Sequence, residues 1–509
     1  MIVIAASIIF AVRHAQPILR TRIINTLSAR FHAHVELAAL HVSVGTELQV
    51  SGEGLKVYGA QDTNPYEPGV QPLISAAEFQ FTSDIFSLLH SPMKISRVYL
   101  RGLELNIPPK SQRQQGGGWM DWEKSRIEIF VSEFVCDQAR LIVNTPRPDK
   151  PPLEFAINNL SMHDIGPGQP LRFTASLINP KPVGNIQSSG FFGPWQPDDI
   201  RSTPVKGDYT FSDADLGTIK GIGGILSSKG DYHGSFDNIL VDGTTDTPDF
   251  RLNISGHPIP LETKFHAIVD GTSGDTYLQP VEAKLHNSSL TANGSIVRMK
   301  DPKGHRILLD VVSKDSRIDD LLRVAVHSDP ALIGESHFQA KLDIEPGSKD
   351  ISERLRLTGN IHIVDARFTN EKIRSRVEDW SQRTRGTPKL VEEGIQEDVR
   401  SDMDATFVLS SGLLSVSQLH FQMPGTRVFM SGTYKVDGSE CDFHGKADLD
   451  AKISQMVTGW KSILLKPVDP FFSKNGAGTE VPISVTGTKS DLHFGLDRNH
   501  KSAQKPTGD

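Results

Sequence analysis

Histidines near the N-terminus are the first residues whose type and spacing point to chemistry. His32 and His34 stand two apart, so on a strand they would share a face, and His41 follows nearby. Imidazole nitrogens bind zinc, usually with thiolates, carboxylates or further imidazoles that complete the ligand set. No cysteine or carboxylate cluster completes the set here. The sequence therefore favours incidental histidines and predicts no metal site.

Catalytic patterns are the next signals to weigh. Ser161, His163 and Asp164 crowd one short stretch, but neighbours in sequence do not by themselves build a catalytic triad. The glycine-rich GIGG at 221–224 is followed by Leu226, where a dinucleotide fingerprint requires glycine or alanine. The sequence contains no Walker loop, G-x-S-x-G or H-E-x-x-H motif. We therefore predict no catalytic residues, no cofactor-binding residues and no enzyme.

Composition narrows the class of protein further. The chain has 509 residues, and its 54 basic and 61 acidic residues give a formal net charge of −7. This balance argues against a nucleic-acid partner. Cys136 and Cys441 lie far apart, so they form neither a disulfide framework nor a metal knuckle. Two unrelated thiols are favoured over a single bridge.

The elements that would position any site follow a period of two. Leu103, Leu105 and Ile107 alternate with polar residues, and the same alternation recurs at 252–254, 361–363, 483–485 and 492–496. Such segments are typical of strands with one apolar and one solvated face. Pairs in which Asp, Asn or Ser precedes a glycine favour tight turns, and we call them glycine pairs; they lie at 242–243, 270–271, 293–294, 431–432 and 437–438. The sequence predicts a mostly β, antiparallel protein built from successive hairpins.

One short unit is reused along the chain. KGDYTF (206–211) and KGDYHGSF (229–236) share the four residues KGDY and form a loose repeat, and SGTYKV (431–436) resembles them later in the chain. The irregular spacing does not match a counted solenoid repeat. We interpret these segments as one strand unit used many times.

Amphipathic stripes predict a few helices, each of which we expect to pack against the sheet. The stripes lie at 318–325, at 371–400 and at 451–465, the last ending before Pro467. At the N-terminus, Met1–Val12 is apolar and a basic helix with Leu19, Ile23, Leu27 and Phe31 follows. Met1–Val12 is shorter than the roughly 20 residues of a membrane span. It is either the remnant of a truncated anchor, which we favour, or a short buried segment.

These signals divide the chain into six expected segments. They are residues 1–31, a membrane segment and basic amphipathic helix; 32–110, an N-terminal β module; 111–118, a linker; 119–350, a central antiparallel β region; 351–498, a C-terminal β region with a helical insert at 371–400 and a helix at 451–465; and 499–509, a polar tail.

Several of these segments resemble the AsmA-like family of diderm bacteria, and the resemblance covers nearly the whole chain. The motifs that carry it are SGEGLKVYG (51–59), PLISAAEFQFTSDIFSLLH (72–90), RVYLRGLELNI (97–107), GIGGILSSKGDYHGSF (221–236), SRIDDLLRVAV (316–326), FQMPGTRVFMSGTYKVDG (421–438), SQMVTGWKSILLKPVDPFFSKNGAGT (454–479) and VPISVTGTKSDLHFGLD (481–497). The last three are the most specific. The short N-terminal apolar segment departs from the family pattern and leaves the membrane topology open.

The resemblance implies a distant relation to TamB and to bridge-like lipid transfer proteins. It implies a single-pass inner-membrane anchor, a periplasmic body and a long twisted antiparallel sheet curled into an apolar groove. The implied partners are phospholipid acyl chains and the inner membrane, with outer-membrane or envelope proteins as further candidates. The implied role is lipid transport in outer-membrane biogenesis.

Other interpretations of the same pattern remain open. Periodicity alone does not separate a groove from packed sandwiches. Roughly 25 to 30 strands at about 4.8 Å each would extend a single sheet on the order of 120–145 Å. The first alternative function is a scaffold for the assembly of outer-membrane proteins. The second is a secreted β-rich hydrolase.

Overall fold

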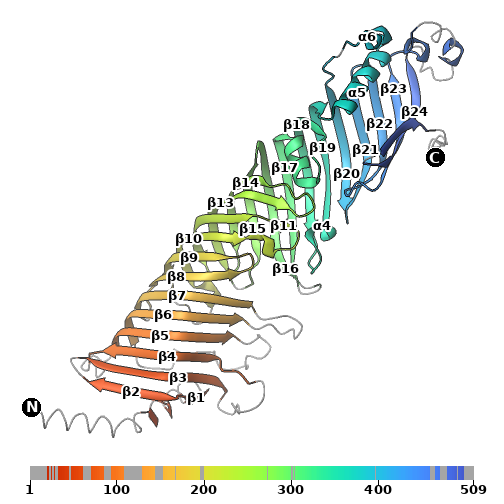
Figure 1. Ribbon diagram of the computed structural model, residues 1–509. Helices are drawn as coiled ribbons and strands as arrows, with labels where there is room; N and C mark the ends of the chain where they lie inside the picture. The colour runs from red at the N-terminus through yellow and green to blue at the C-terminus, as the bar shows by residue number, and fades with distance from the viewer. Residues whose placement is uncertain are drawn as a thin grey trace, which may run out of the picture. The chain divides into compact units, whose positions relative to one another are not determined.

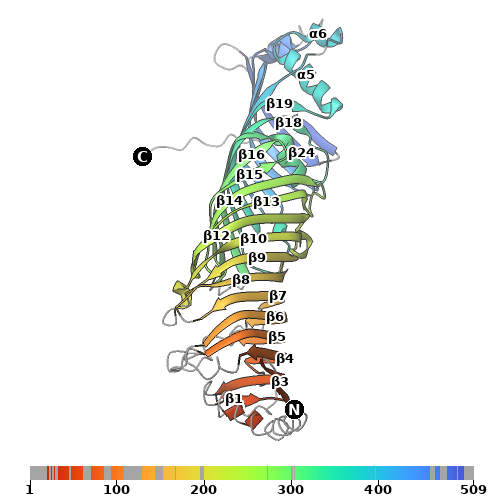
Figure 2. The same cartoon turned by 90° about the vertical axis from the view of Figure 1, so that its left-hand side faces the viewer.

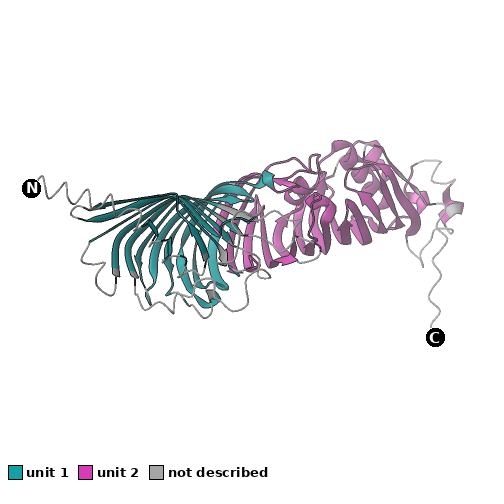
Figure 3. Ribbon diagram, turned by 90° about the horizontal axis from the view of Figure 1, so that it is seen from below, with its two compact units in different colours: residues 1–218, 227–243, 269–272 teal, residues 219–226, 244–268, 273–509 magenta. Residues whose placement is uncertain are grey.

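The chain forms one large, open, mixed β-sheet of 25 strands with few helices, seen here in a computed structural model (Figure 1). The structure describes residues 20–497, apart from 61–69, 85–92, 108–128, 144–152, 459–464, 470–477 and shorter gaps. Two compact units divide the chain. Unit 1 holds residues 1–218, 227–243 and 269–272, and unit 2 holds residues 219–226, 244–268 and 273–509 (Figure 3).

The strands of unit 1 lie side by side in chain order (Figure 1, Figure 2). Their bounds are β1 (Ala33–Glu36), β2 (Ala39–Val44), β3 (Leu48–Ala60), β4 (Ile74–Ser83), β5 (Met93–Ile107), β6 (Ile129–Val143), β7 (Leu153–Ile165), β8 (Leu171–Pro180), β9 (Val183–Phe192), β10 (Pro204–Asp215) and most of β12 (Ile225–Ser235). The long strand β3 pairs with both β1 and β2. Residues 20, 21, 24, 25 and 28 are helical, and Ile24 packs beside Val35 and Val57.

The strands that belong wholly or mainly to unit 2 form a second run. They are β11 (Ile222–Gly223), β13 (Asn238–Leu252), β14 (Ile259–Val269), β15 (Thr276–Leu285), β16 (Ser288–Met299), β17 (Gly304–Arg317), β18 (Leu332–Ile344), β19 (Leu355–Phe368), β20 (Ser401–Ser410), β21 (Leu413–Met423), β22 (Thr426–Lys435), β23 (Cys441–Leu449), β24 (Thr479–Thr488) and β25 (Asp491–Leu496). From β15 to β25 each strand pairs antiparallel with the next.

The helices of unit 2 lie between these strands in sequence. The α-helices described there are α3 (Ile318–Ala325), α4 (Ile351–Arg354), α5 (Glu371–Thr384) and α6 (Pro388–Glu392). The 3₁₀ turns among the described residues of the chain are η3 (Ile200–Ser202), η4 (Leu216–Thr218), η5 (Ile453–Gln455) and η6 (Lys466–Val468). No helix among the described residues has the length and apolar character needed to cross a membrane.

The expectation of a purely antiparallel sheet is wrong at one place. Strands β5 and β6 pair parallel, from Met93 opposite Ile129 to Ile107 opposite Val143. A parallel pair requires a connection of a dozen or more residues instead of a tight turn. Residues 108–128 separate the two strands and meet that requirement. The linker expected at 111–118 and the tail at 499–509 lie outside the described residues.

Three of the five glycine pairs expected in turns lie within strands. The pairs at 242–243, 293–294 and 431–432 are inside β13, β16 and β22, whereas those at 270–271 and 437–438 do occupy turns. A Cβ on Gly294 would lie 1.9 Å from the Leu308 carbonyl oxygen, and one on Gly432 would lie 2.2 Å from that of Asp442. The strands approach too closely there for any side chain, so glycine marks a close contact instead of a turn. Ile254, expected in a strand, lies in the turn after β13.

The stripe at 318–325 forms helix α3 and packs against the sheet as expected. Ile318 is buried, and Leu321 and Leu322 contact the same cluster as Leu332 and Ile363. The carboxylate of Asp320, 1% exposed, accepts hydrogen bonds from Asn287 N (3.0 Å) and Ser288 Oγ (2.9 Å). Apolar packing and these two hydrogen bonds hold the helix on the sheet.

The insert at 371–400 is helical only as far as Glu392, and its apolar stripe does not pack as expected. Helix α5 begins at Asn370, whose side chain accepts from the backbone of Lys372 and Ile373. Its buried side is polar, because Ser381 Oγ donates to Pro424 O (2.8 Å) and Gln382 Nε2 to Ile395 O (2.7 Å). Trp380 is left 39% exposed. Hydrogen bonds, not apolar burial, hold this helix.

The α-helix expected at 451–465 is not formed over the described residues 451–458. One 3₁₀ turn, η5, stands there instead. The carboxylate of Asp469 accepts from Ser454 N (2.9 Å) and Ser454 Oγ (2.7 Å), and Gln455 Oε1 accepts from Lys452 N (2.9 Å). Side chains that bind the backbone in this way compete with helix propagation. Trp460 lies outside the described residues.

Candidate functional site

The main surface feature of unit 1 is an apolar face shared by consecutive strands. Residues that pair across neighbouring strands lie on the same face of a sheet. Six paired positions run from β3 to β8, and we call them the unit-1 ladder: Val50, Phe81, Val98, Phe134, Met162 and Phe173. Val50 is 5% exposed and the other five are half-buried. The ladder carries no ionisable group.

Unit 2 has an apolar face of the same kind. Seven paired positions run from β17 to β23, and we call them the unit-2 ladder: Leu309, Leu342, Leu357, Leu409, Leu414, Tyr434 and Cys441. All are buried or half-buried. Helix α3 covers Ile363 and Ala366 on this face, and Met456 packs beside Ala447 and Val481. Unit 2 is therefore partly covered by its own chain.

The opposite face of unit 1 is polar and carries paired charges. Arg97 Nε lies 3.2 Å from Glu133 Oε2, and the Arg172 guanidinium lies 5.7 Å from the centre of the Phe191 ring. His163 stands on this face between Glu133 and Arg172. Exposed pairs of this kind stabilise a sheet only modestly. These charged side chains are typical of the side of a sheet that faces solvent.

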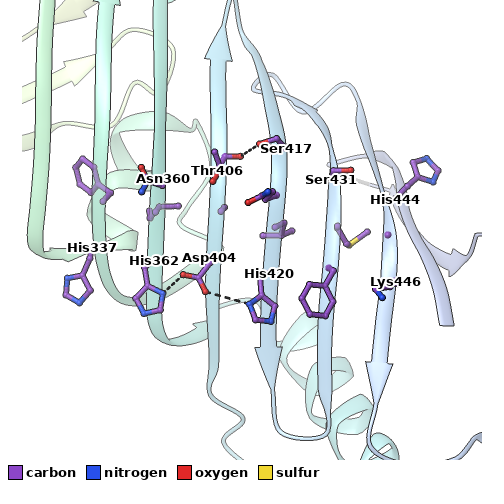
Figure 4. Close-up of a pocket in the computed structure, with 18 of the residues that line it drawn as sticks. His337, Asn360, His362, Asp404, Thr406, Ser417, His420, Ser431, His444 and Lys446 are labelled. Atoms are coloured by element: carbon purple, nitrogen blue, oxygen red, sulfur yellow. Dashed lines mark hydrogen bonds and ion pairs between the residues drawn. The ribbon is translucent and has the colours of Figure 1, made fainter. Parts of the chain in front are cut away.

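The polar face of unit 2 contains a shallow groove of about 1320 Å³. One wall is a row of paired side chains across β18 to β23: His337, His362, Asp404, His420, Phe429 and Lys446 (Figure 4). The other wall includes Asn360, Thr406, Ser417, Ser431 and His444. The groove crosses the strands rather than following one of them.

The groups in this groove bind one another. His362 Nδ1 lies 2.7 Å from Asp404 Oδ1, and the rings of His420 and Phe429 stack at 4.6 Å. Lys446 Nζ donates to Glu480 Oε2 at 2.9 Å, which raises the pKa of the lysine. Such cross-strand pairs stabilise a sheet.

The described residues among those weighed in the sequence analysis for metal binding or catalysis do not form a metal site or a catalytic triad. His34 Nε2 lies 3.7 Å from Glu36 Oε1, His41 is exposed on β2, and His32 lies outside the described residues. Among described residues, no group of three or more histidines, cysteines and carboxylates is placed to hold a metal. Ser161 Oγ and His163 Nε2 are 3.2 Å apart, but within the described chain no bond joins Asp164 to that pair.

The two cysteines are separate, buried thiols. Cys136 is 0% exposed and Cys441 is 8% exposed, and neither forms a disulfide. Burial raises the pKa of the Cys136 thiol to about 11, with a smaller contribution from Asp137. A thiol with so high a pKa is a poor nucleophile. Both residues belong to the apolar lining, where Cys136 pairs with Leu100 and Leu160.

Sequence reasoning missed one polar cluster on the apolar face of unit 1. Tyr209 on β10 and Tyr232 on β12 are half-buried there, and each hydroxyl bonds to a serine. Tyr232 Oη lies 2.8 Å from Ser188 Oγ, and Tyr209 Oη lies 3.0 Å from Ser228 Oγ. The signal was present in the repeated KGDY motif, which contributes both tyrosines.

Known proteins give no independent identification. No protein-family model, curated protein or solved structure matches this chain. The family resemblance therefore rests on the sequence motifs. The functional argument rests on the two faces of the sheet.

Proposed function

We propose that this chain is a non-enzymatic lipid-binding or lipid-transfer protein of the periplasm. An N-terminal segment would anchor it in the inner membrane, and its sheet would hold phospholipid acyl chains during outer-membrane biogenesis. The observation that carries the proposal is the run of apolar positions across consecutive strands in each unit. The AsmA-like resemblance supplies the compartment and the membranes.

The extent of the apolar lining supports a lipid ligand. A large apolar face on a protein is normally covered by protein, by a partner or by lipid. In the described part of unit 1, only the helix that contains Ile24 is placed over this face, at β1 to β3. Each buried methylene contributes about 0.8 kcal/mol, so acyl chains would bind without any charged pocket.

Differences in exposure support a sheet that curls toward its apolar side. On the polar face, Phe191 is 46% and Leu413 is 39% exposed, whereas the ladder residues Phe134 and Leu414 on the apolar face are half-buried. A Cβ on Gly190, which is on the apolar face, would lie 2.1 Å from Lys206 O. Crowding of this kind is expected on the inner side of a bent sheet, where glycine permits curvature.

Lipid analysis of the purified protein tests the proposal. We expect full-length protein made in a diderm bacterium and purified without detergent to carry phospholipid, measured by native mass spectrometry and lipid extraction. Met162→Glu places a charge in the unit-1 ladder and should reduce the bound lipid several-fold, because burying an unpaired carboxylate beside acyl chains is unfavourable.

Ser161→Glu is the matched control, because Ser161 is the neighbouring residue of β7 on the polar face. It should leave the bound lipid unchanged. Thermal unfolding of both variants separates loss of lipid from loss of folding. Wild-type protein without any bound phospholipid would contradict the proposal and favour an assembly scaffold.

The proposed topology has its own test. A reporter enzyme that is active only in the periplasm, fused after Asp509, should be active in cells. Activity only of a cytoplasmic reporter at the same position would overturn the proposed compartment without touching the argument from the apolar faces.

A further inference from the structure

The hydroxyl cluster of unit 1, made of Ser188, Tyr209, Ser228 and Tyr232, is built by crossed contacts between β10 and β12. These strands pair with each other. A Cβ on Gly207 would lie 2.7 Å from Tyr232 Oη, and a Cβ on Gly230 would lie 2.9 Å from Tyr209 Cε1. Each tyrosine therefore lies across the glycine of the other KGDY copy.

The aromatic rings alone would fill the space that these glycines leave on the sheet. An aromatic side chain that covers a glycine on the adjacent strand is a known way to stabilise a sheet. Phe79 covers Gly52 and Phe443 covers Gly432 in this manner, with atoms 2.4 Å and 2.8 Å from the positions of the missing Cβ. Only the β10–β12 pair among these contacts uses tyrosine. The hydroxyls therefore add a property that packing does not require.

The hydrogen bonds of the cluster leave binding capacity unused. Ser188 Oγ donates to Asp208 O at 2.9 Å, so Tyr232 donates to Ser188. Tyr209 and Ser228 share one bond and together carry two O–H groups, so one O–H remains to donate. Tyr232 Oη keeps its lone pairs as an acceptor. Burial is the main cause that raises the pKa of both tyrosines, so both stay protonated donors.

On the side of β7 to β9, the cluster adjoins apolar positions of the same face. Leu160 and Ala175 precede Ser188 in the same row of paired residues, and Met162 and Phe173 precede Gly190 in the next row. An amphiphile whose chains lie along the apolar face also needs hydrogen-bond partners for its oxygen-rich part. Ester carbonyls and phosphate oxygens accept hydrogen bonds, and ammonium or hydroxyl groups donate them.

We propose that the hydroxyl cluster is a polar subsite that binds the ester and headgroup region of a glycerophospholipid while its acyl chains lie on the apolar face. This inference rests on the proposed function and names the part of the lipid recognised by these residues. It also assigns a role to the KGDY repeat: each copy supplies one tyrosine and the glycine on which the other tyrosine lies.

The test removes the hydroxyls and keeps the rings. We expect Tyr209→Phe combined with Tyr232→Phe to weaken binding of dihexanoyl phosphatidylethanolamine to full-length protein about tenfold, as loss of one hydrogen bond predicts. Binding of diphenylhexatriene, a hydrocarbon probe without oxygen, should stay unchanged. Should the double variant fail to fold, Tyr209→Phe alone carries the test, because it removes one hydroxyl of the pair with the spare donor.

Tyr99→Phe is the matched control, because Tyr99 lies on the polar face of unit 1 and its hydroxyl also makes one hydrogen bond, to Asp137 Oδ2 at 3.1 Å. It should change the binding of neither probe. Equal affinity of wild type and the double variant for the phospholipid, or an equal loss in Tyr99→Phe, overturns the subsite. Wild-type protein that binds neither probe contradicts the proposed function itself, which is a distinguishable result.

Discussion

The two units present the same kind of apolar face but differ in how much of it their described residues cover. In unit 2, helix α3 and the segment around Met456 pack on it and bury Ile363 to 3% and Val481 to 5% exposure. In unit 1, the described residues place only the helix with Ile24 over β1 to β3, and the ladder from β4 to β8 stays half-buried. Six of the seven residues of the unit-2 ladder are also half-buried, so the units differ in which positions their described helices and loops cover.

Truncation of one residue in each face should give the largest effect and tests this comparison directly. Ile363→Ala leaves a cavity under α3 and should cost about 3 kcal/mol of unfolding free energy. Met162→Ala in unit 1 should cost about 1 kcal/mol, since a half-buried side chain loses less contact. Amide hydrogen exchange of β19 and of β7 measures each cost within its own unit.

Equal costs at the two positions would break the comparison. They would mean that protein packs Met162 as fully as Ile363, which would leave no room for an acyl chain beside Met162. Addition of phospholipid sharpens the same measurement. It should slow exchange in β7 and leave β19 unchanged.

A second prediction concerns how closely the strands approach on the apolar face. Gly230→Ala places a Cβ 2.1 Å from Asp242 O and 2.9 Å from Tyr209 Cε1. Asp242 O belongs to the backbone of the adjacent strand and cannot move without disturbing it, so we expect a loss of about 1–3 kcal/mol in unfolding free energy. Gly495→Ala is the control, because no atom lies within 4 Å of the added Cβ. Its effect on thermal unfolding should stay within about 0.5 kcal/mol.

Residue alternation in the sequence was sufficient to predict the class of fold. It identified β5, β19, β24 and β25 and gave a strand number close to that observed, because a period of two follows from strand geometry itself. Helix α3 was also predictable, since its stripe is apolar and packs on the sheet. The parallel β5–β6 pair was not, because local alternation carries no information about strand direction.

Three further features depended on contacts between residues far apart in the sequence. Glycine in a pair such as Asn293–Gly294 permits a turn or a close strand contact, and the partner strand decides which one forms. Helix α5 buries Ser381, Gln382 and Thr384 because their partners Pro424, Ile395 and Thr426 come from elsewhere in the chain. The hydroxyl cluster was visible only as the KGDY repeat until β10 and β12 were paired.

The smallest predicted effect is a pH dependence of stability, caused by a histidine of β23 that binds the residue after β25. His444 on β23 lies between two carboxylates: its Nδ1 is 2.8 Å from Asp497 Oδ2 and its Nε2 is 2.9 Å from Asp442 Oδ1. Both ring nitrogens donate only when the imidazole is protonated. The bond to Asp497, with a smaller contribution from Asp442, raises the pKa of His444. Its partners on the adjacent strands, Ser431 and Ser484, are uncharged, and Lys446 on its own strand is paired with Glu480.

A raised pKa in the folded state fixes the sign of the pH dependence. The protonated histidine contributes stability that is fully present below its unfolded pKa of about 6.5. That contribution is lost as the pH rises through the higher folded pKa, because one donor to a carboxylate disappears. The melting-temperature difference between wild type and His444→Gln should therefore be largest near pH 5 and shrink at higher pH. His493→Gln, at an exposed histidine on β25 beside Asp491, should show a smaller difference. A difference for His444→Gln that grew with pH would show that the neutral ring, not the imidazolium, holds Asp497 in place.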